Sequence, residues 1–160
     1  MSSDMFLKIE GLDGESVDSV HADAVDVLAW SWGMTQSGTM HLATGGGSGK
    51  VAVQDISVTK YVDSTSANMM QKCCTGEHFP EATLIVRKAG SDPLEYFTIT
   101  MKSVLVTAIS TGGSGGEDRL TENVTLNFAE FAVCYTPQMA DGSGGAAMDI
   151  AFHIAQNAVV

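Results

Sequence analysis

The sequence predicts a mainly β protein whose strands curl into a barrel or a sandwich, with one short α-helix at its side. Three observations predict this class. Apolar residues recur at every second position in most segments between turns, which is the periodicity of strands. Several long segments change parity part-way, as strands with β-bulges do in curled sheets. Only residues 63–75 carry apolar residues at helical spacing.

The length and composition predict one domain, residues 1–160, with an ordinary apolar content of 44%. Nineteen acidic residues against eight basic ones give a net charge of −11. That balance argues against nucleic acid and against an anionic membrane surface as partners, since both attract clustered Lys and Arg. Copies of the chain repel one another, so any self-assembly depends on shape and hydrogen bonds.

The start of the sequence lacks the basic and long apolar regions of a signal peptide, and no apolar run approaches the ~20 residues that span a bilayer. The three cysteines are odd in number, and Cys73 and Cys74 are adjacent. These features predict a chain that starts in a reducing cytoplasm and leaves it, if at all, without a signal sequence.

The segment 25–37 holds both tryptophans and is predicted to be a strand with two unlike faces. The large face is made by Leu28, Trp30, Trp32 and Met34. We expect this face to anchor the core, where truncating either tryptophan would cost ~3–5 kcal/mol. The other face carries Val27, Ala29, Ser31, Gly33 and Thr35, whose mostly small side chains let a second surface approach closely.

The remaining periodic segments predict further strands at 5–9, 51–61, 82–88, 95–110, 120–135 and 149–157. The segment 95–110 is either one long strand or two strands joined by a bend. Parity changes predict bulges near Asp55 and near Ala129. The helix is predicted to begin at Asp63 or Ser64 and to end before Gly76. Its apolar stripe, expected to pack on the sheet, is Ala67, Met69, Met70, Cys73 and Cys74.

Two glycine-rich segments, 38–50 and 111–119, are predicted to be long loops, which are often functional in compact domains. The second contains Ser114 in a Gly-x-Ser-x-Gly pattern, but predicted strands on both sides do not suit a nucleophile elbow. Val51 after Gly49-Lys50 does not suit a phosphate loop. Cys73, Cys74 and His78 lack the ligand spacing of a zinc site. The residues therefore predict no catalytic, cofactor-binding or metal site.

Several blocks of the sequence carry a family resemblance. They include Val27-Leu28-Ala29-Trp30-Ser31-Trp32-Gly33, Val53-Gln54-Asp55, Thr59-Lys60-Tyr61 and Arg87-Lys88-Ala89-Gly90. The most specific block is the long run from Ser110 to Phe128. Together the blocks extend from about Met5 to Tyr135, and they resemble the haemolysin-coregulated protein (Hcp) family of bacterial type VI secretion systems.

The resemblance implies a single β-barrel of two antiparallel sheets with one short α-helix and long glycine-rich loops. It implies a structural tube subunit and not an enzyme, without cofactors. Homo-hexameric rings stack into the inner tube, carry small effector proteins in the lumen, and work with spike and sheath components. The subunit is cytoplasmic before firing and is then secreted with its cargo.

The resemblance also implies roles for two sets of positions. Ser31 and Ala29 are expected to line the lumen and contact effectors. The loop after the tryptophan strand is expected to contact neighbouring subunits, within or between rings. Its residues in this role are Gly38, Thr39, Met40, His41, Gly45, Gly46, Gly47 and Ser48.

Two other functions remain open on the sequence alone. One is a secreted hydrolase that uses Ser114 or a carboxylate pair assembled by the fold. The other is a generic β-barrel binding module with one ligand per monomer and no ring.

Overall fold

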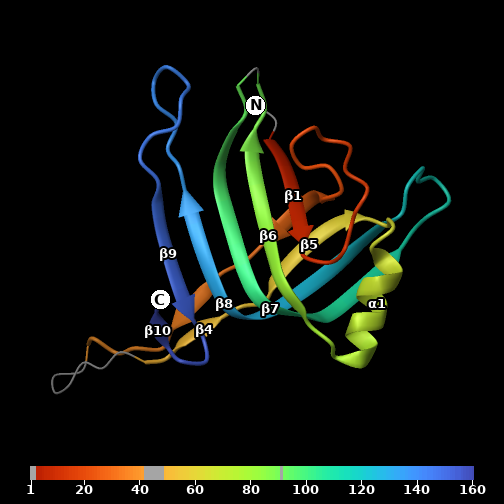
Figure 1. The fold of residues 1–160 in the computed structure, drawn as a ribbon. Helices are drawn as coiled ribbons and strands as arrows, with labels where there is room; N and C mark the ends of the chain where they lie inside the picture. Colours follow the sequence, from red (N-terminus) through yellow and green to blue (C-terminus); the bar gives the residue numbers. More distant parts are fainter. Residues whose placement is uncertain (1–2, 42–48, 91) are drawn as a thin grey trace.

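The computed structural model describes residues 3–41, 49–90 and 92–160, and that part of the chain forms ten strands and one helix (Figure 1). The strands are β1 (Ser3–Ile9), β2 (Val25–Ser31), β3 (Met34–Gln36), β4 (Val51–Val53), β5 (Ile56–Tyr61), β6 (Phe79–Lys88), β7 (Leu94–Gly112), β8 (Thr121–Tyr135), β9 (Met148–His153) and β10 (Ala158–Val159). The helix α1 is Ser66–Thr75. No helix among these residues is long and apolar enough to cross a membrane.

Six antiparallel strands close into a barrel in the order β8-β5-β2-β1-β6-β7, because β7 also pairs with β8. The strands β9 and β10 extend the sheet from β8, and β3 and β4 form a separate two-stranded sheet. The strand β8 pairs with β5 through residues 121–126 and with β9 through residues 130–135. The predicted fold class, a mainly β barrel with one short helix, is confirmed.

The inside of the barrel is filled with aliphatic and aromatic side chains. Leu7, Ile56, Leu84, Ile99 and Leu126 are each 0–1% exposed and belong to one continuous core. Six strands enclose only enough space for side chains, and here side chains occupy it. The barrel is therefore not a channel, and any conduit must lie outside it.

A buried charged network lies where the barrel meets the start of α1. Lys60 of β5 and Glu122 of β8 are directly opposite each other, are both fully buried, and form an ion pair. The Lys60 ammonium also donates to Asp63 Oδ1 at 3.0 Å and to Ser66 Oγ at 3.3 Å. Ser66 in turn donates to Glu122 Oε1 at 2.6 Å. The network joins two strands to the helix start through Glu122 Oε1, whereas the buried Oε2 of the same carboxylate has no hydrogen-bond partner among the described residues.

The helix begins later and buries less than its sequence predicts. It starts at Ser66, after Asp63 Oδ1 has accepted the Thr65 N–H at 2.9 Å. Gly76 ends it as predicted, with a left-handed φ of +74° and its N–H on Lys72 O. Of the predicted stripe, Met69 is buried and Cys73 partly buried, while Ala67, Met70 and Cys74 are exposed. The prediction that the helix packs on the sheet is confirmed, since α1 contacts β7. The predicted stripe is too wide, because only the side of the helix with Met69 and Cys73 faces the core.

The tryptophan segment does not keep one parity, so the prediction of a single large apolar face is wrong. The pairing of β2 with β5 shifts between Val27 and Ala29, and this irregularity exchanges the inward and outward positions. Val25 and Val27 are buried before it, and Trp30 and Trp32 pack against the core after it while remaining partly exposed. Leu28 is 39% exposed and Met34 is 45% exposed.

Both tryptophans contact core phenylalanines. The Trp30 ring stacks on Phe97 with centroids 5.7 Å apart, and the Trp32 ring meets Phe131 edge-on at 4.9 Å. Because both tryptophans are partly exposed, we expect truncating either one to lower the free energy of unfolding by less than it would for a fully buried tryptophan.

Two other parity changes have different structural causes. Near Asp55 the chain leaves one sheet for another, with β4 ending at Val53 and β5 starting at Ile56, so the predicted bulge is a break between strands. Near Ala129 the pairing of β7 with β8 is interrupted opposite Ser103, whose φ is +54°. Phe128 and Phe131 are consequently both buried, but the register of β7 with β8 does not shift there, so the predicted bulge near Ala129 is wrong. The register shift of this pair lies between Val106 and Ala108. The last predicted strand is also interrupted, since a turn separates β9 from β10.

The buried ion pair generates a stability prediction. Replacing Lys60→Met leaves the Glu122 carboxylate buried without its cation, and we expect the free energy of unfolding to fall by about 3–5 kcal/mol. The double variant Lys60→Met with Glu122→Leu removes both charges and should recover most of that loss. Urea denaturation measures both values. A single variant within ~0.5 kcal/mol of the parent would show that the pair does not stabilise the fold.

Candidate functional site

Small side chains form a continuous surface on the outside of the barrel, across β2, β5, β8 and β7. Strand pairing places them in two adjacent rows. One row is Ser31, Ser57, Thr125 and Ala108, and the other is Ala29, Thr59, Asn123 and Ser110. All eight are exposed or partly exposed. We call these eight residues the small-residue surface.

Side-chain hydrogen bonds between strands connect residues in and beside this surface. Thr59 Oγ1 donates to Asn123 Oδ1 at 2.7 Å within it. Beside it, Asp55 accepts from Thr107 Oγ1 at 2.8 Å and from Asn127 Nδ2 at 2.7 Å. The eight residues carry no charge and have small side chains. The surface therefore offers hydroxyl and amide groups and has no large side chains that project from it. Such a wall can contact another polypeptide without strongly selecting its charge.

A two-stranded arm leaves the barrel beside this surface. β3 and β4 pair from Met34↔Val53 to Gln36↔Val51, and Figure 1 shows them projecting away from the barrel. At the root, Gln54 N–H donates to Gly33 O at 2.9 Å and Trp32 Nε1 donates to Gln54 O at 2.8 Å. The arm is thus attached at its root by two hydrogen bonds and a core-packed indole.

Four of the predicted inter-subunit residues are described by the structure, and they follow β3 of this arm in the chain. Gly38, Met40 and His41 are exposed, Met40 at 84%, and Thr39 is partly buried. The other predicted positions, Gly45, Gly46, Gly47 and Ser48, lie outside the described residues.

Arginine and aspartate fix the loop between β1 and β2 to the end of the barrel, a feature that strand periodicity does not predict. Arg87 of β6 donates from Nη2 to Asp18 Oδ1 at 2.6 Å and to Asp4 Oδ2 at 3.1 Å, and from Nη1 to Asp18 Oδ2 at 3.1 Å. Its guanidinium lies over the Phe6 ring, 5.0 Å from the centroid. These hydrogen bonds, with one from the His21 N–H, hold the pKa of Asp18 well below its usual range.

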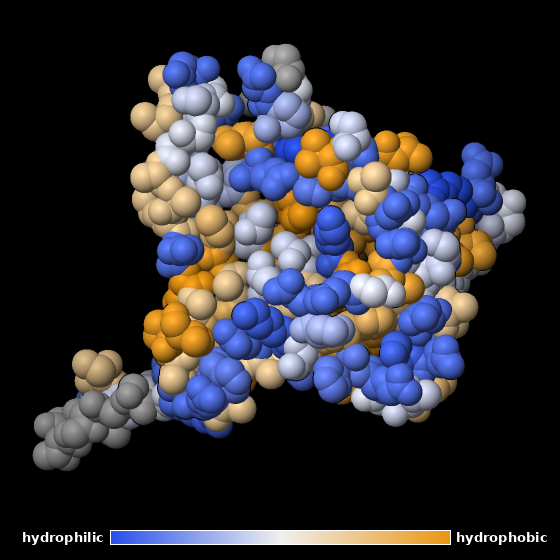
Figure 2. Space-filling view, viewed as in Figure 1, coloured by the Kyte–Doolittle hydropathy of each residue, from blue (hydrophilic) through white to orange (hydrophobic). Residues whose placement is uncertain are grey.

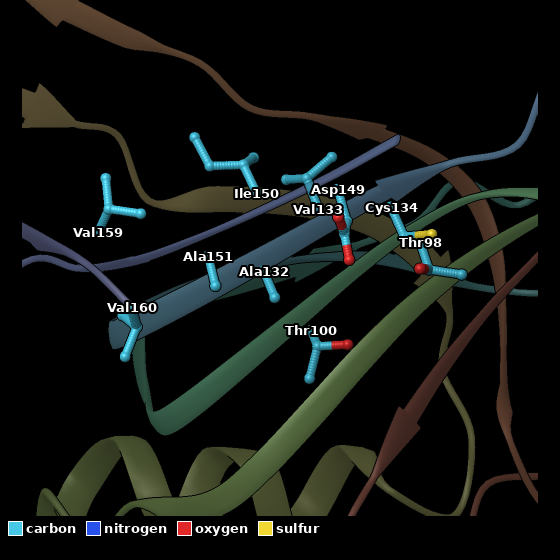
Figure 3. Close-up of a pocket in the computed structure, with 10 residues that line it drawn as sticks. All are labelled: Thr98, Thr100, Ala132, Val133, Cys134, Asp149, Ile150, Ala151, Val159 and Val160. Atoms are coloured by element: carbon cyan, nitrogen blue, oxygen red, sulfur yellow. The ribbon is translucent and has the colours of Figure 1, made fainter. Parts of the chain in front are cut away.

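The flank formed by β7, β8 and β9 carries a shallow hollow of about 320 Å³ (Figure 3). Thr98 and Thr100 line it from β7, Cys134 from β8, and Asp149 and Val160 from the C-terminal end of the chain. One thiol, one carboxylate and two hydroxyls without a neighbouring imidazole do not make an activated nucleophile, which needs an adjacent base.

The other candidate reactive groups do not assemble either. Ser114 lies in the turn between β7 and β8, where its carbonyl accepts the Glu117 N–H at 3.2 Å, and no helix follows it as a nucleophile elbow requires. Within residues 3–41, 49–90 and 92–160, no three His, Cys, Asp or Glu side chains are placed to hold a metal ion.

Sequence comparison identifies the family. A profile described as "Type VI secretion system effector, Hcp" matches residues 6–135. The chain belongs to the Hcp family. It is 57% identical over 159 residues to Protein hcp1 of Pseudomonas aeruginosa, with 98% of each chain covered. This Hcp-family chain is accordingly a protein of the type VI secretion system, which is a multi-protein machine.

Solved structures agree with that membership. One described as the structure of a type six secretion system protein superposes with a TM-score of 0.93 at 26% identity, covering 99% of this chain and 100% of the other. Hcp1 from Salmonella typhimurium superposes with a TM-score of 0.83 at 35% identity, covering 100% of both chains. The barrel described above is thus shared by several Hcp proteins.

The sequence placed two residues of the small-residue surface correctly on the outside, and missed the other six. Ala29 and Ser31 are both exposed, as their alternation with the tryptophans predicts. Ser57, Thr59, Asn123 and Thr125 join them only through strand pairing between segments far apart in the chain. Hydroxyl residues alternating with Val and Leu in β5 and β8 were the available signal.

The Asp18–Arg87 contact generates a prediction about pH. Because the pKa of Asp18 is lowered in the folded state, its contribution to stability is complete above the ordinary value of 3.8 and is lost only as the pH falls through the lower folded pKa. Methyl NMR shifts of Val17 and Val20 should therefore stay native through pH 4 and change below it. In Asp18→Asn the same shifts should already differ at neutral pH. A transition centred on the ordinary carboxyl value would contradict the assignment.

Proposed function

We propose that this chain is the tube subunit of a type VI secretion system. Six copies form a ring, rings stack into a tube, and small effector proteins travel in the lumen. The observation that supports this is a smooth, neutral small-residue surface on the outside of a barrel whose interior is filled. A barrel with a packed core can form a passage only between copies, and this surface is suited to be its wall.

The chemistry of the surface favours generic contact with cargo. Hydroxyl and amide groups such as those of Ser31, Thr59 and Asn123 hydrogen-bond to polar groups of many proteins. The side chains of Ala29 and Ser31 are too small to project far from the surface, so a bulky side chain at either position would enter the lumen. We assign effector contact to these two residues, and the remaining six extend the wall around them.

Contacts between subunits belong to the projecting arm in this proposal. The net charge of −11 opposes association, so the contact requires an element that extends beyond the acidic body. Gly38, Thr39, Met40 and His41 supply it, continued by Gly45, Gly46, Gly47 and Ser48. The subunit has no catalytic role, waits in the cytoplasm beside spike and sheath components, and is secreted when the machine fires.

A matched pair of substitutions tests the lumen assignment. Ala29→Tyr adds a bulky side chain to the small-residue surface, and Ala67→Tyr adds the same group to the exposed side of α1. Both variants should form rings of six by native mass spectrometry. Proteins that co-purify with the parent rings from the native bacterium should fall at least tenfold with Ala29→Tyr and remain with Ala67→Tyr.

The proposal would fail in either of two ways. A parent protein that stays monomeric at micromolar concentration has no lumen. Equal co-purification with both tyrosine variants would place effector contact elsewhere on the ring.

A further inference from the structure

We propose that the β1–β2 loop of one copy docks, through Val17 and Val20, into an apolar groove at the root of the arm of another copy. The inference rests on the proposed function, because it names a second pair of surfaces, in addition to the arm residues, through which subunits of the tube meet. It gives the groove at the root of the arm a binding partner. It also gives a role to the β1–β2 loop, which the sequence marks only as polar.

The groove is a small hollow where the arm passes over the flank of the barrel. Met34 and Val51 line it from β3 and β4, Phe131 from β8, and Ile150 and Phe152 from β9. Its volume is about 130 Å³, far above the ~10–15 Å³ of occupied volume that one water needs. All five lining side chains are apolar, so a water there would find no side-chain hydrogen-bond partner and an aliphatic group is the suitable occupant.

Apolar exposure continues from the groove along the flank. Ile150 is 52% exposed, Val159 75% and Val160 67%. Figure 2 shows apolar atoms gathered on the side of the molecule where β9 and β10 lie. A patch of this kind at the edge of a sheet is a typical site of protein association.

The β1–β2 loop carries a matching pair of side chains. Val17 is 98% exposed and Val20 66% exposed, on either side of Asp18. Asp18 is held by the buried Arg87, and its Oδ2 also accepts the N–H groups of Val20 and His21 at 3.0 Å. The two valines are therefore presented in a fixed position, which lowers the entropy lost on binding.

Charge selects the arm of a second copy as the partner of this loop. Residues 10–24 contain five carboxylates and no Lys or Arg. Residues 27–54 contain Lys50 and no carboxylate, in a chain with 19 acidic residues. The contact thus places the acidic loop beside the longest acid-free segment, which supplies Met34 and Val51 of the groove and carries Lys50. Repulsion there is weaker than on the strands of the body that bear carboxylates.

Geometry excludes the loop of the same copy as the occupant. Figure 1 shows the β1–β2 loop at the upper right of the molecule, beside β1, and the arm at the lower left. Loop and groove are different surfaces on opposite sides of the barrel, so their contact is heterologous. Heterologous contacts repeat from copy to copy, closing into rings or continuing as stacks.

A mixing experiment tests the contact in the full chain. Val17→Asp disables the loop, Ile150→Asp disables the groove, and Val62→Asp is a matched change at a valine 37% exposed beside α1. Each of the first two variants should require at least a tenfold higher concentration for assembly by analytical ultracentrifugation, while Val62→Asp should match the parent. Circular dichroism melts verify folding, and Met34→Asp replaces Ile150→Asp if the latter unfolds.

The decisive sample is the equimolar mixture of the two disabled variants. Val17→Asp keeps an intact groove and Ile150→Asp keeps an intact loop, so one chain of each can still form a single contact. The mixture should therefore form complexes of limited size. These would hold two chains if the contact lies within a ring, or two rings if the contact joins rings. Separately, Lys50→Glu should weaken parent assembly most at low salt.

Failure of this inference can be told from failure of the proposed function. If the parent protein never assembles, the proposed function as a tube subunit is contradicted. A parent that assembles normally, with Val17→Asp and Ile150→Asp assembling as well as Val62→Asp, keeps the tube and overturns the loop-to-groove contact. Full-length assembly by the mixture, instead of limited complexes, would also overturn it.

Discussion

The pairing of β7 with β8 is the contact on which the rest of the structure depends. The ladder runs from Phe97↔Tyr135 to Gly112↔Thr121 and joins the two longest strands. Without it the sheet would have two open edges, because β7 and β8 are where the barrel closes. The same ladder lets β8 change its other neighbour from β5 to β9, so one strand serves both the closed barrel and the apolar flank.

That change of neighbour has a local physical cause. Opposite Ala129 the backbone of Ser103 takes a φ of +54°, and the ladder loses its regular alternation there. Phe128 and Phe131 can then both face inward, the first into the barrel and the second toward Trp32 and Phe152. The root of the arm is packed on this aromatic group, so the irregularity that bends the strand also provides the arm with a firm base.

The sequence predicted features that depend on residues close together in the chain, and failed for features that depend on pairing between distant segments. The helix end at Gly76 follows from local propensity and is confirmed. Local alternation also places strand structure at residues 95–110, but only the structure decides that it is one strand, β7, and not two joined by a bend. The parity of the tryptophan segment does not, because a register shift between Val27 and Ala29 is decided by pairing with β5. The break at Asp55 has the same origin, since alternation alone cannot tell a bulge from a change of sheet.

Features that require two distant segments were beyond the sequence. Periodicity placed Ser31 and Ala29 outside, but the rows they share with Thr125 and Asn123 exist only through strand order. Likewise, Lys60 and Glu122 read as surface charges on alternating strands until pairing puts them face to face inside the barrel. Charged residues tolerate such burial only with a partner, so each is evidence for the other once the topology is known.

The filled barrel and the excess of negative charge together constrain what a conduit made from this chain can be. A packed interior moves the passage to the space between copies, and the wall must then be an outer face that does not bind strongly to its cargo. A net charge of −11 sets copies against one another, so their contacts must be short-ranged and made by the least acidic elements. In the proposed assembly, the arm, with Lys50 and no carboxylate in its sequence, meets that requirement, and the small-residue surface beside it would then stay free for cargo.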